Sequence, residues 1–364
     1  MITSNFYNVV MQPTTLCNAD CEYCYLPLRH KNMLMDVNVA KAIAEAIEEQ
    51  DAPYTVPLVW HGGEPLVTGL KRFRELIMCF EPLRKKGLVK HHIQTNGTLI
   101  TDAWCKFFTE FNFQIGVSND GPSWANAQRV DWLGKPIYDM VIRGIECLKR
   151  HNIPFAVISV IKEDTIEQVD ELYEFFSTIG CVQWNLNIEE VEGTNKGTAQ
   201  YVDDDRIQTF WKRLFSIWRV NPVIAIREFN YVLQYADSVL RGQKDGTAED
   251  LKIDPFPTIG YDGNVVLLSP EFAGIESEKY GDFVVGNVLT DPLSEIITRS
   301  IKASYVGEYQ QAINMCAESC PFFGFCAGGQ ASNRYFEHGT IAVTETAYCR
   351  NSRQRLLTAV VESL

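Results

Sequence analysis

The stretch YNVVMQPTTLCNADCEYCYLP, residues 7–27, places three cysteines within eight residues, shortly after an apolar run. The run 7–13 has the pattern of a buried strand, and Cys17, Cys21 and Cys24 follow it with the spacing C-x3-C-x2-C. The triplet therefore lies on a loop at the carboxyl end of that strand. In parallel α/β folds this edge of the sheet carries the functional residues.

Five more apolar runs alternate with helical patterns, and they predict strands at 57–61, 90–95, 113–118, 154–161 and 182–188. One predicted helix follows a cap at Asp36. Another follows a capping box formed by Asp164 and Glu167 and ends at Gly180. Six strands that alternate with helices predict an α/β fold with a parallel sheet, open or curled into a partial barrel.

The pattern changes after about residue 192, where two helical stripes of apolar residues predict a helical insert. The first stripe is Ile207, Phe210, Trp211, Leu214, Phe215 and Trp218, and the second is Ile226, Phe229, Leu233, Ala236 and Leu240. A linker rich in Gly, Pro and Asp spans 242–260, and a hairpin signal follows at 261–264. We expect a barrel domain at 1–200, a helical insert and linker at 201–253, and a cysteine-rich domain at 254–364.

The net charge of −13 argues against a nucleic-acid partner, because phosphate binding requires a positive surface. No run of about 18 apolar residues exists, which argues against a membrane span. The first residues, MITSNFYNVV, lack the pattern of a secretory signal. Eleven cysteines without a signal predict a reducing, cytoplasmic location, where cysteine clusters indicate metal sites before disulfides.

Three other interpretations of the first cysteine triplet compete with an iron–sulfur site. They are a zinc site completed by His30, a disulfide, and three unrelated buried thiols. The position after a strand favours a site for chemistry. Three thiolates on a short loop can hold three irons of a [4Fe–4S] cube and leave the fourth iron open.

The triplet, with Tyr23 just before its last cysteine, resembles the motif of the radical S-adenosylmethionine (radical SAM) superfamily. The resemblance implies that the open iron chelates the amino and carboxylate groups of SAM. It also implies that SAM is split into methionine and a 5′-deoxyadenosyl radical, which abstracts hydrogen from substrate.

Further motifs stand where this family has them. His61 precedes Gly62, Gly63, Glu64 and Pro65, which are similar to the GGEP element that supports the SAM amino group. The glycines would let the backbone approach the ligand, and the carboxylate would offset a cation. Motifs at 94–97 and 118–122 follow the next two strands, although both are also ordinary loop sequences. The resemblance assigns Ser118 and Arg129 to polar contacts with SAM.

A second cluster, Cys316, Cys320, Cys326 and Cys349, has the spacing C-x3-C-x5-C-x22-C. A four-thiolate zinc site is the alternative. The tail resembles a SPASM domain, which implies an auxiliary [4Fe–4S] cluster. It departs from that pattern, because the stretch 254–274 has no cysteine and Gln330 stands where another is expected. We therefore expect two clusters in all, the outer auxiliary one saturated by four thiolates and suited to electron transfer.

The whole chain resembles the radical SAM/SPASM maturases of ribosomally synthesised peptides, of the GrrM and FxsB type, which form crosslinks that include cyclophanes. This implies a partial (β/α)6 TIM-type barrel with a helical insert and a C-terminal SPASM-like iron–sulfur domain. It also implies a precursor peptide as partner and an electron donor such as flavodoxin or ferredoxin. Glu271 is the candidate general base, with a solvated surface carboxylate as the alternative.

Two other functions stay open. A sulfatase-type maturase would oxidise a Cys or Ser of a protein, and its family carries the full three-cluster pattern; a zinc-binding adaptor would not need the GGEP element. Thioether formation, epimerisation and hydroxylation are further peptide chemistries of the same class. The remaining cysteines lie singly in or beside predicted helices, and we expect structural burial for them: Cys79, Cys105, Cys147 and Cys181.

Overall fold

The computed structural model describes residues 2–195, 204–242, 251 and 253–364. All six predicted strands form, and together with a short seventh they run parallel in one sheet. They are β1 (Val9–Met11), β2 (Val56–Trp60), β3 (Val89–Thr95), β4 (Gln114–Ser118), β5 (Phe155–Ile161), β6 (Gln183–Ile188) and β7 (Ala225–Ile226). Their alternating burial follows from the apolar pattern of the sequence.

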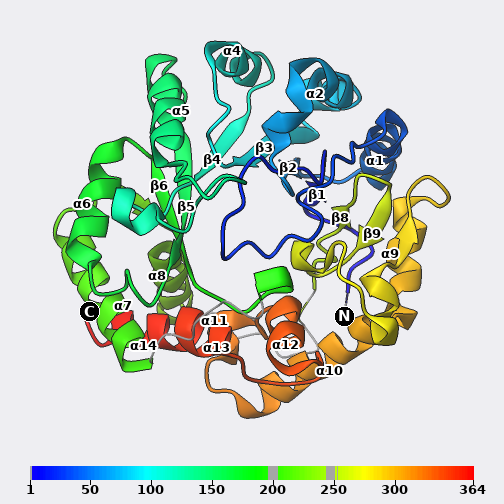
Figure 1. Cartoon of the computed structure of the whole chain (residues 1–364). Coiled ribbons are helices and arrows are strands. Elements are labelled where there is room, and N and C mark those ends of the chain that lie inside the picture. Colours follow the sequence, from blue (N-terminus) through cyan, green and yellow to red (C-terminus); the bar gives the residue numbers. More distant parts are fainter. Residues whose placement is uncertain (1, 196–203, 243–250, 252) are drawn as a thin grey trace.

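Three strands from the C-terminal part extend the same sheet beyond β1. They are β8 (Thr258–Ile259), which pairs parallel with β1, and the antiparallel strands β9 (Asn264–Val266) and β10 (Gly286–Asn287). The predicted hairpin at 261–264 is the turn between β8 and β9. The sheet order is β10-β9-β8-β1-β2-β3-β4-β5-β6-β7, so the sheet is unclosed. Figure 1 shows these strands along an arc.

Helices cover the outside of the arc (Figure 1). In the barrel part they are α1 (Val37–Gln50), α2 (Gly69–Met78), α3 (Glu81–Lys85), α4 (Asp102–Glu110), α5 (Tyr138–Arg150) and α6 (Val169–Ile179). The cap predicted at Asp36 is confirmed, because its carboxylate accepts a hydrogen bond from the Asn38 amide at 2.7 Å. The predicted capping box is wrong. Helix α6 begins at Val169, after Thr165 Oγ1 accepts from the Lys162 amide and closes a turn.

The C-terminal half is mostly helical and lies across the open side of the arc (Figure 1). Its helices are α7 (Asp204–Val220), α8 (Arg227–Leu240), α9 (Leu293–Arg299), α10 (Ser304–Ser319), α11 (Phe323–Cys326), α12 (Ala331–His338), α13 (Ala347–Cys349) and α14 (Arg355–Val361). The predicted boundary near residue 200 and most of 243–252 lie outside the described residues. The three-part division stays a prediction, and β8 ties the third part to the first.

The two predicted apolar stripes are buried to different extents. The α7 stripe is almost entirely buried, and the indole of Trp211 donates to the Asn351 carbonyl at 2.9 Å. In α8 the buried apolar side chains are Phe229 and Val232, whereas Leu240 at the helix end is 87% exposed. In the described part of the chain, no helix combines the length and the apolar character that crossing a membrane requires.

Helix α5 packs against the loop after β3 at a contact that admits only glycine. A Cβ on Gly144 would lie 2.1 Å from the carbonyl oxygen of Gly97. Gly97 has a φ of +77°, a conformation that favours glycine. The loop that leads to α4 is therefore pressed onto the backbone of α5.

We expect Gly144→Ala to lower the free energy of unfolding by about 1–3 kcal/mol, because the backbone of α5 or of the loop must move to admit the methyl group. Gly307→Ala is the matched control: a methyl group added to this exposed glycine of α10 would have no atom within 4 Å. It should stabilise by about 0.5–1 kcal/mol, since alanine favours helix. Anaerobic chemical denaturation measures both, and equal effects of the two substitutions would contradict the packing argument.

Candidate active site

The three cysteines of the first cluster lie on the loop that follows β1. The amide of Cys17 donates to the Arg29 carbonyl at 2.9 Å, and the amide of Cys24 donates to the Cys21 carbonyl at 3.1 Å. The indole of Trp132 donates to the Cys17 carbonyl at 2.8 Å. All three cysteine residues are half-buried, and no disulfide joins them. Burial raises the pKa of each thiol. The backbone therefore fixes the loop, and its thiols are not tied up in a disulfide.

The predicted glycine pair lies directly under this loop. A Cβ on Gly63 would meet the carbonyl oxygens of Leu16, Thr14 and Thr15 at 2.6, 2.7 and 2.8 Å, and Gly63 has a φ of +64°. The next amide, that of Glu64, donates to the Leu16 carbonyl at 2.8 Å. The close approach that the sequence predicted between glycine and ligand is, in the structure, a close approach between two backbones.

The Glu64 carboxylate is 1% exposed and bonded to protein donors. It accepts from Thr95 Oγ1 at 2.7 Å, the Asn96 amide at 2.7 Å and the Leu66 amide at 3.0 Å. Burial raises the pKa of Glu64, and these donors oppose that rise. The carboxylate thus joins β3 to the short 3-10 helix η1 (Pro65–Thr68), with Pro65 in its first turn.

The loop after β3 reaches the first cysteine. Asn96 Nδ2 lies 3.8 Å from Cys17 Sγ and donates to Asn18 Oδ1 at 2.9 Å. Ser118, at the end of β4, accepts from Gln94 Nε2 at 2.9 Å and is half-buried. The motifs predicted at 94–97 and 118–122 therefore lie at the same edge of the sheet as the cysteines, as parallel strands require.

Arg129 is 5% exposed and belongs to a network that includes Tyr23. Its Nη1 donates to Tyr23 Oη at 2.5 Å and lies 3.9 Å from Asp120, and Tyr23 Oη donates to Asp120 Oδ2 at 2.7 Å. Burial alone would lower the pKa of Arg129, but Tyr23, Cys21 and Asp120 hold it above its usual range. Its Nε is buried and has no hydrogen-bond partner among the described residues. A buried cation with a spare donor thus lies beside the cysteine loop.

Three carboxylates, Glu190, Glu192 and Glu271, form what we call the acidic cluster. Glu192 Oε1 accepts from Ser332 Oγ at 3.0 Å, Asn333 Nδ2 donates to both Glu190 and Glu192, and Ser269 Oγ donates to Glu271. Burial first, then mutual repulsion, raises the pKa of Glu190 to about 8 and that of Glu192 well above its usual value. Burial also raises the pKa of Glu271.

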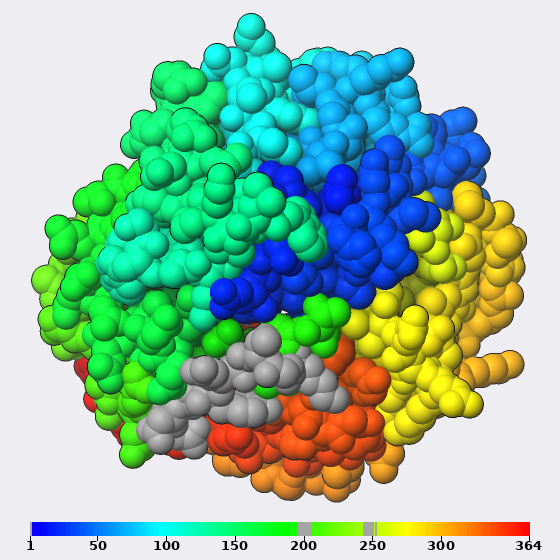
Figure 2. Space-filling view, in the orientation of Figure 1, coloured from blue at the N-terminus to red at the C-terminus, as the bar shows by residue number. Residues whose placement is uncertain are grey.

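The acidic cluster lies next to the cysteine loop. Burial, Glu271, Cys24 and Glu192, in that order, raise the pKa of Tyr25, whose hydroxyl is 2.7 Å from His61 Nε2. Figure 2 shows the blue N-terminal segment, the green segment near residue 190 and the orange C-terminal segment meeting near the centre of one face. The sequence reasoning selected Glu271 and missed Glu190 and Glu192, which carry no motif.

The segment just after the acidic residues fastens the cysteine loop from the other side. Asn195 Nδ2 donates to the Tyr23 carbonyl at 2.8 Å, and Thr194 Oγ1 donates to the Cys24 carbonyl at 3.0 Å. A Cβ on Gly193 would lie 2.1 Å from the Tyr25 carbonyl oxygen. The cysteine loop is thus held between the loop after β2 and the segment after β6.

Two of the four C-terminal cysteines, Cys316 and Cys349, lie beside the carbonyl group of Thr344. Cys316 Sγ is 3.4 Å and Cys349 Sγ 4.0 Å from the same Thr344 carbonyl oxygen. After burial, Cys349 and Cys320 are among the groups that raise the pKa of Cys316 and of Cys326. Arg334, 1% exposed and missed by the sequence reasoning, has its Nη2 3.3 Å from Cys316 Sγ.

Aromatic side chains pack beside the cysteine-free stretch 254–274. Phe272, in the 3-10 helix η4 (Pro270–Phe272) that also carries Glu271, stacks on Phe283 with ring centroids 4.1 Å apart. Tyr305, Tyr335 and Phe336 complete this group. Gln330 Nε2 lies 3.3 Å from Tyr348 Oη. Phe272 in the cysteine-free stretch thus packs among aromatic rings, and Gln330, where a cysteine was expected, makes an amide contact.

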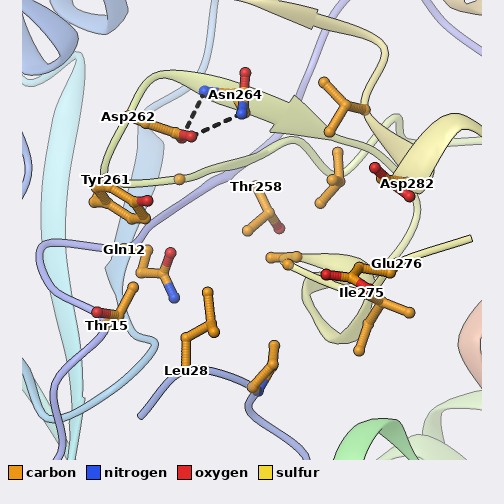
Figure 3. A pocket seen from close by; sticks show the side chains of 16 residues that line it. Gln12, Thr15, Leu28, Thr258, Tyr261, Asp262, Asn264, Ile275, Glu276 and Asp282 are labelled. Carbon is orange, nitrogen blue, oxygen red and sulfur yellow. Dashed lines mark hydrogen bonds between the residues drawn. The ribbon is translucent and has the colours of Figure 1, made fainter. Parts of the chain in front are cut away.

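A cavity of about 240 Å³ opens between the cysteine loop and the β8–β9 hairpin (Figure 3). Thr258, Tyr261 and Asp262 line it from the hairpin, and Leu28 from the end of the cysteine loop. Gln12, at one side of the cavity, lies against Gly62. The cavity is thus a neighbour of the glycine pair and has room for a substrate side chain.

The four remaining cysteines differ from the expectation in two respects. Cys105, Cys147 and Cys181 are buried as expected, but Cys79 is only half-buried. Cys105 and Cys147 do not lie singly, because their sulfur atoms are 3.6 Å apart. They are 42 residues apart in the sequence, and no pattern predicts their contact.

Comparison with known proteins identifies a matching family. The model of the radical SAM superfamily matches residues 11–176. A protein of Synechocystis sp., described as uncharacterised, is 32% identical over 98% of this chain and 91% of its own length. The serine-type anaerobic sulfatase-maturating enzyme of Bacteroides thetaiotaomicron is 27% identical, with 90% and 83% covered.

Solved structures share the fold. A structure of native anSMEcpe with bound AdoMet superposes with a TM-score of 0.77, at 23% identity over 98% of this chain and 97% of that one. Streptococcus suis SuiB bound to precursor peptide SuiA superposes with a TM-score of 0.64, at 18% identity over 95% of this chain and 76% of that one.

The acidic cluster predicts a pH dependence of stability. The folded state holds a proton on Glu190 up to about pH 8, whereas the unfolded chain releases it near 4.5, so stability falls as pH rises through this window. Glu190→Gln keeps an acceptor for Asn333 and should flatten the fall between pH 5 and pH 8. Anaerobic thermal unfolding at pH 5 and pH 8 measures this fall in stability. Glu278→Gln, which changes an exposed carboxylate, is the control. An unchanged slope in Glu190→Gln would refute the assignment.

Proposed function

The chain belongs to the radical SAM superfamily, and on that premise we propose that it is a maturase that forms an oxidative side-chain crosslink in a ribosomally synthesised peptide. As a radical SAM enzyme it uses a [4Fe–4S] cluster and SAM. The observation that carries the proposal is the junction of three parts: the cysteine loop, the acidic cluster and the C-terminal cysteine module. Asn195 links the first to the second, and Ser332 links the second to the third.

The cysteine loop fits the cluster. Cys17, Cys21 and Cys24 would supply three thiolates from one short loop whose backbone is fixed on both sides. The Asn96 amide near Cys17 would donate to a ligand sulfur, a contact that tunes such sites. A cluster held by these residues would supply the electron for the cleavage of SAM, from which hydrogen abstraction from the substrate would follow.

Two features of the chain suit SAM. The buried Nε of Arg129 is a donor for a carboxylate, and Ser118 lies at the same edge of the sheet. The Glu64 carboxylate is occupied by protein donors, so the GGEP element would support the SAM site by holding the loops after β1, β2 and β3 together.

The C-terminal cysteines fit an auxiliary cluster better than one zinc ion. Zinc at about 2.3 Å from each thiolate places neighbouring sulfurs about 3.8 Å apart. Among the described residues, no three of Cys316, Cys320, Cys326 and Cys349 bring their sulfurs within 4.8 Å of one another. A wider set of four thiolates suits a saturated iron–sulfur cube that accepts an electron.

Crosslinking requires a base and an electron acceptor. When a carbon radical attacks an aromatic ring, one electron and one proton remain to be removed. Glu271 would take the proton: it lies beside Tyr25 and the cysteine loop, and burial raises its pKa toward the range of an efficient base. The C-terminal module, joined to the same site by Asn333, would take the electron.

A second candidate is the oxidation of a Cys or Ser residue to formylglycine. It is favoured by the 27% identity to the serine-type sulfatase-maturating enzyme over most of both chains. It also removes one electron and one proton after hydrogen abstraction, so the same residues would serve it. The stretch 254–274, filled by Phe272 and its neighbours instead of cysteines, supports the crosslinking maturase.

The function is tested by anaerobic co-expression with the peptide encoded beside the gene, followed by mass spectrometry. We expect each modification to remove two hydrogen atoms and to block fragmentation between two residues, because a new covalent bond joins their side chains. Cys17→Ala should abolish the change, because one iron ligand is lost.

Other outcomes identify the alternatives. Serine oxidation also removes two hydrogens, but its aldehyde reacts with a hydrazide probe and fragmentation is not blocked. Cysteine oxidation replaces sulfur by oxygen and removes two hydrogens. A gain of oxygen indicates hydroxylation, and no mass change indicates epimerisation; any of these results would reject crosslinking.

Glu271→Gln tests the base. We expect deoxyadenosine release to continue while crosslinked product falls by a factor of about 100 or more, the usual contribution of general base catalysis. Glu276→Gln, which changes an exposed carboxylate on the same segment, is the control. It should leave both deoxyadenosine release and the amount of crosslinked product unchanged. Loss of deoxyadenosine release would assign Glu271 to structure, and unchanged product would remove it from the mechanism.

A further inference from the structure

Two helices outside the site bring metal-binding side chains together. Cys105 on α4, Cys147 on α5 and His151 at the end of α5 each offer one donor atom, and these atoms all lie within 4.8 Å of one another. Among the described residues this is the only group of His, Cys, Asp and Glu with that spacing. The two thiols are buried and His151 is half-buried.

The distances match a single tetrahedral ion. Two thiolates on zinc, each about 2.3 Å from the metal, lie about 3.8 Å apart. Cys105 Sγ and Cys147 Sγ are 3.6 Å apart, which is far longer than a disulfide and close to that edge. Two thiols and an imidazole are also donors that bind zinc better than they bind harder cations, which prefer oxygen ligands.

A fourth donor stands beside the group. Asp102 Oδ1, in the first turn of α4, is 3.3 Å from Cys147 Sγ and 2.8 Å from His151 Nε2. Arg150 Nη2 contacts the same oxygen at 3.3 Å, so the carboxylate has a cationic partner as well. The Asp102 side chain is 65% exposed, which gives an ion a path from solvent to the buried thiols.

We propose that Cys105, Cys147, His151 and Asp102 bind one zinc ion that fastens α4 to α5. The proposal does not depend on the reaction that the enzyme catalyses. Under this proposal, the seven cysteines of the first loop and the C-terminal module hold iron–sulfur clusters. Cys105 and Cys147, whose sulfur atoms are close enough to share one ion, bind zinc.

The position gives the ion a structural role. Helix α4 begins six residues after Asn96, whose amide lies 3.8 Å from Cys17 Sγ. The loop between them rests on α5, since the carbonyl of Gly97 touches Gly144. An ion that joins the two helices would therefore hold the base of the loop that contacts the cysteine cluster.

The test is metal analysis of the anaerobically purified holoenzyme from cells grown with zinc. We expect about one zinc per chain in addition to the iron. Cys105→Ser with Cys147→Ser should lose the zinc and keep the iron content, with a lower midpoint of thermal unfolding. Cys79→Ser with Cys181→Ser is the matched control, with two cysteines outside every proposed site, and should keep both metals.

X-ray absorption at the zinc edge identifies the ligands directly, even where the double variant fails to fold. The proposal expects two sulfur neighbours at about 2.3 Å and two nitrogen or oxygen neighbours at about 2.0–2.2 Å. Four sulfur neighbours would place the zinc in the C-terminal cysteines and overturn it. Absence of zinc from the wild-type holoenzyme, or a Cys105–Cys147 crosslinked peptide in place of zinc, would overturn it as well.

Discussion

No side chain fits between residue 63 and the cysteine loop, and the rest of the site depends on this constraint. The carbonyls of Thr14, Thr15 and Leu16 would lie within 2.8 Å of any Cβ at Gly63. The loop after β2 is therefore in backbone contact with the loop after β1, and Glu64 next to it binds the loop after β3. Three consecutive strand ends are held together by these contacts, so the placement of the three cysteines does not depend on a disulfide.

Much of the fold could be predicted, because apolar periodicity and caps are local. The six parallel strands form within a few residues of their predicted positions, and Asp36 caps α1 as expected. The errors have local physical causes. Thr165 closes a turn with Lys162, so that α6 begins later than the capping box suggested. Leu240 fits the apolar stripe of α8 but lies at its end and is exposed.

The site could be predicted only where its residues lie close together in the sequence and form a motif. The cysteine loop and the glycine pair are such motifs. Glu192 meets Ser332 across 140 residues of sequence, and Cys105 meets Cys147 across 42, so no pattern could pair them. The role of Arg334 could not be predicted either, because arginine is usually exposed. Only the fold shows that this arginine is buried against Cys316.

Arg334 also bears on the direction in which electrons would move under the proposed function. Its guanidinium is held by the carbonyls of Gly328, at 2.6 Å, and Val343, at 2.7 Å, so the charge cannot swing away from Cys316. A fixed cation beside a ligand sulfur favours the more negative, reduced state and raises the reduction potential. A cluster held by the C-terminal cysteines would then accept an electron from the substrate more readily than the same cluster without Arg334.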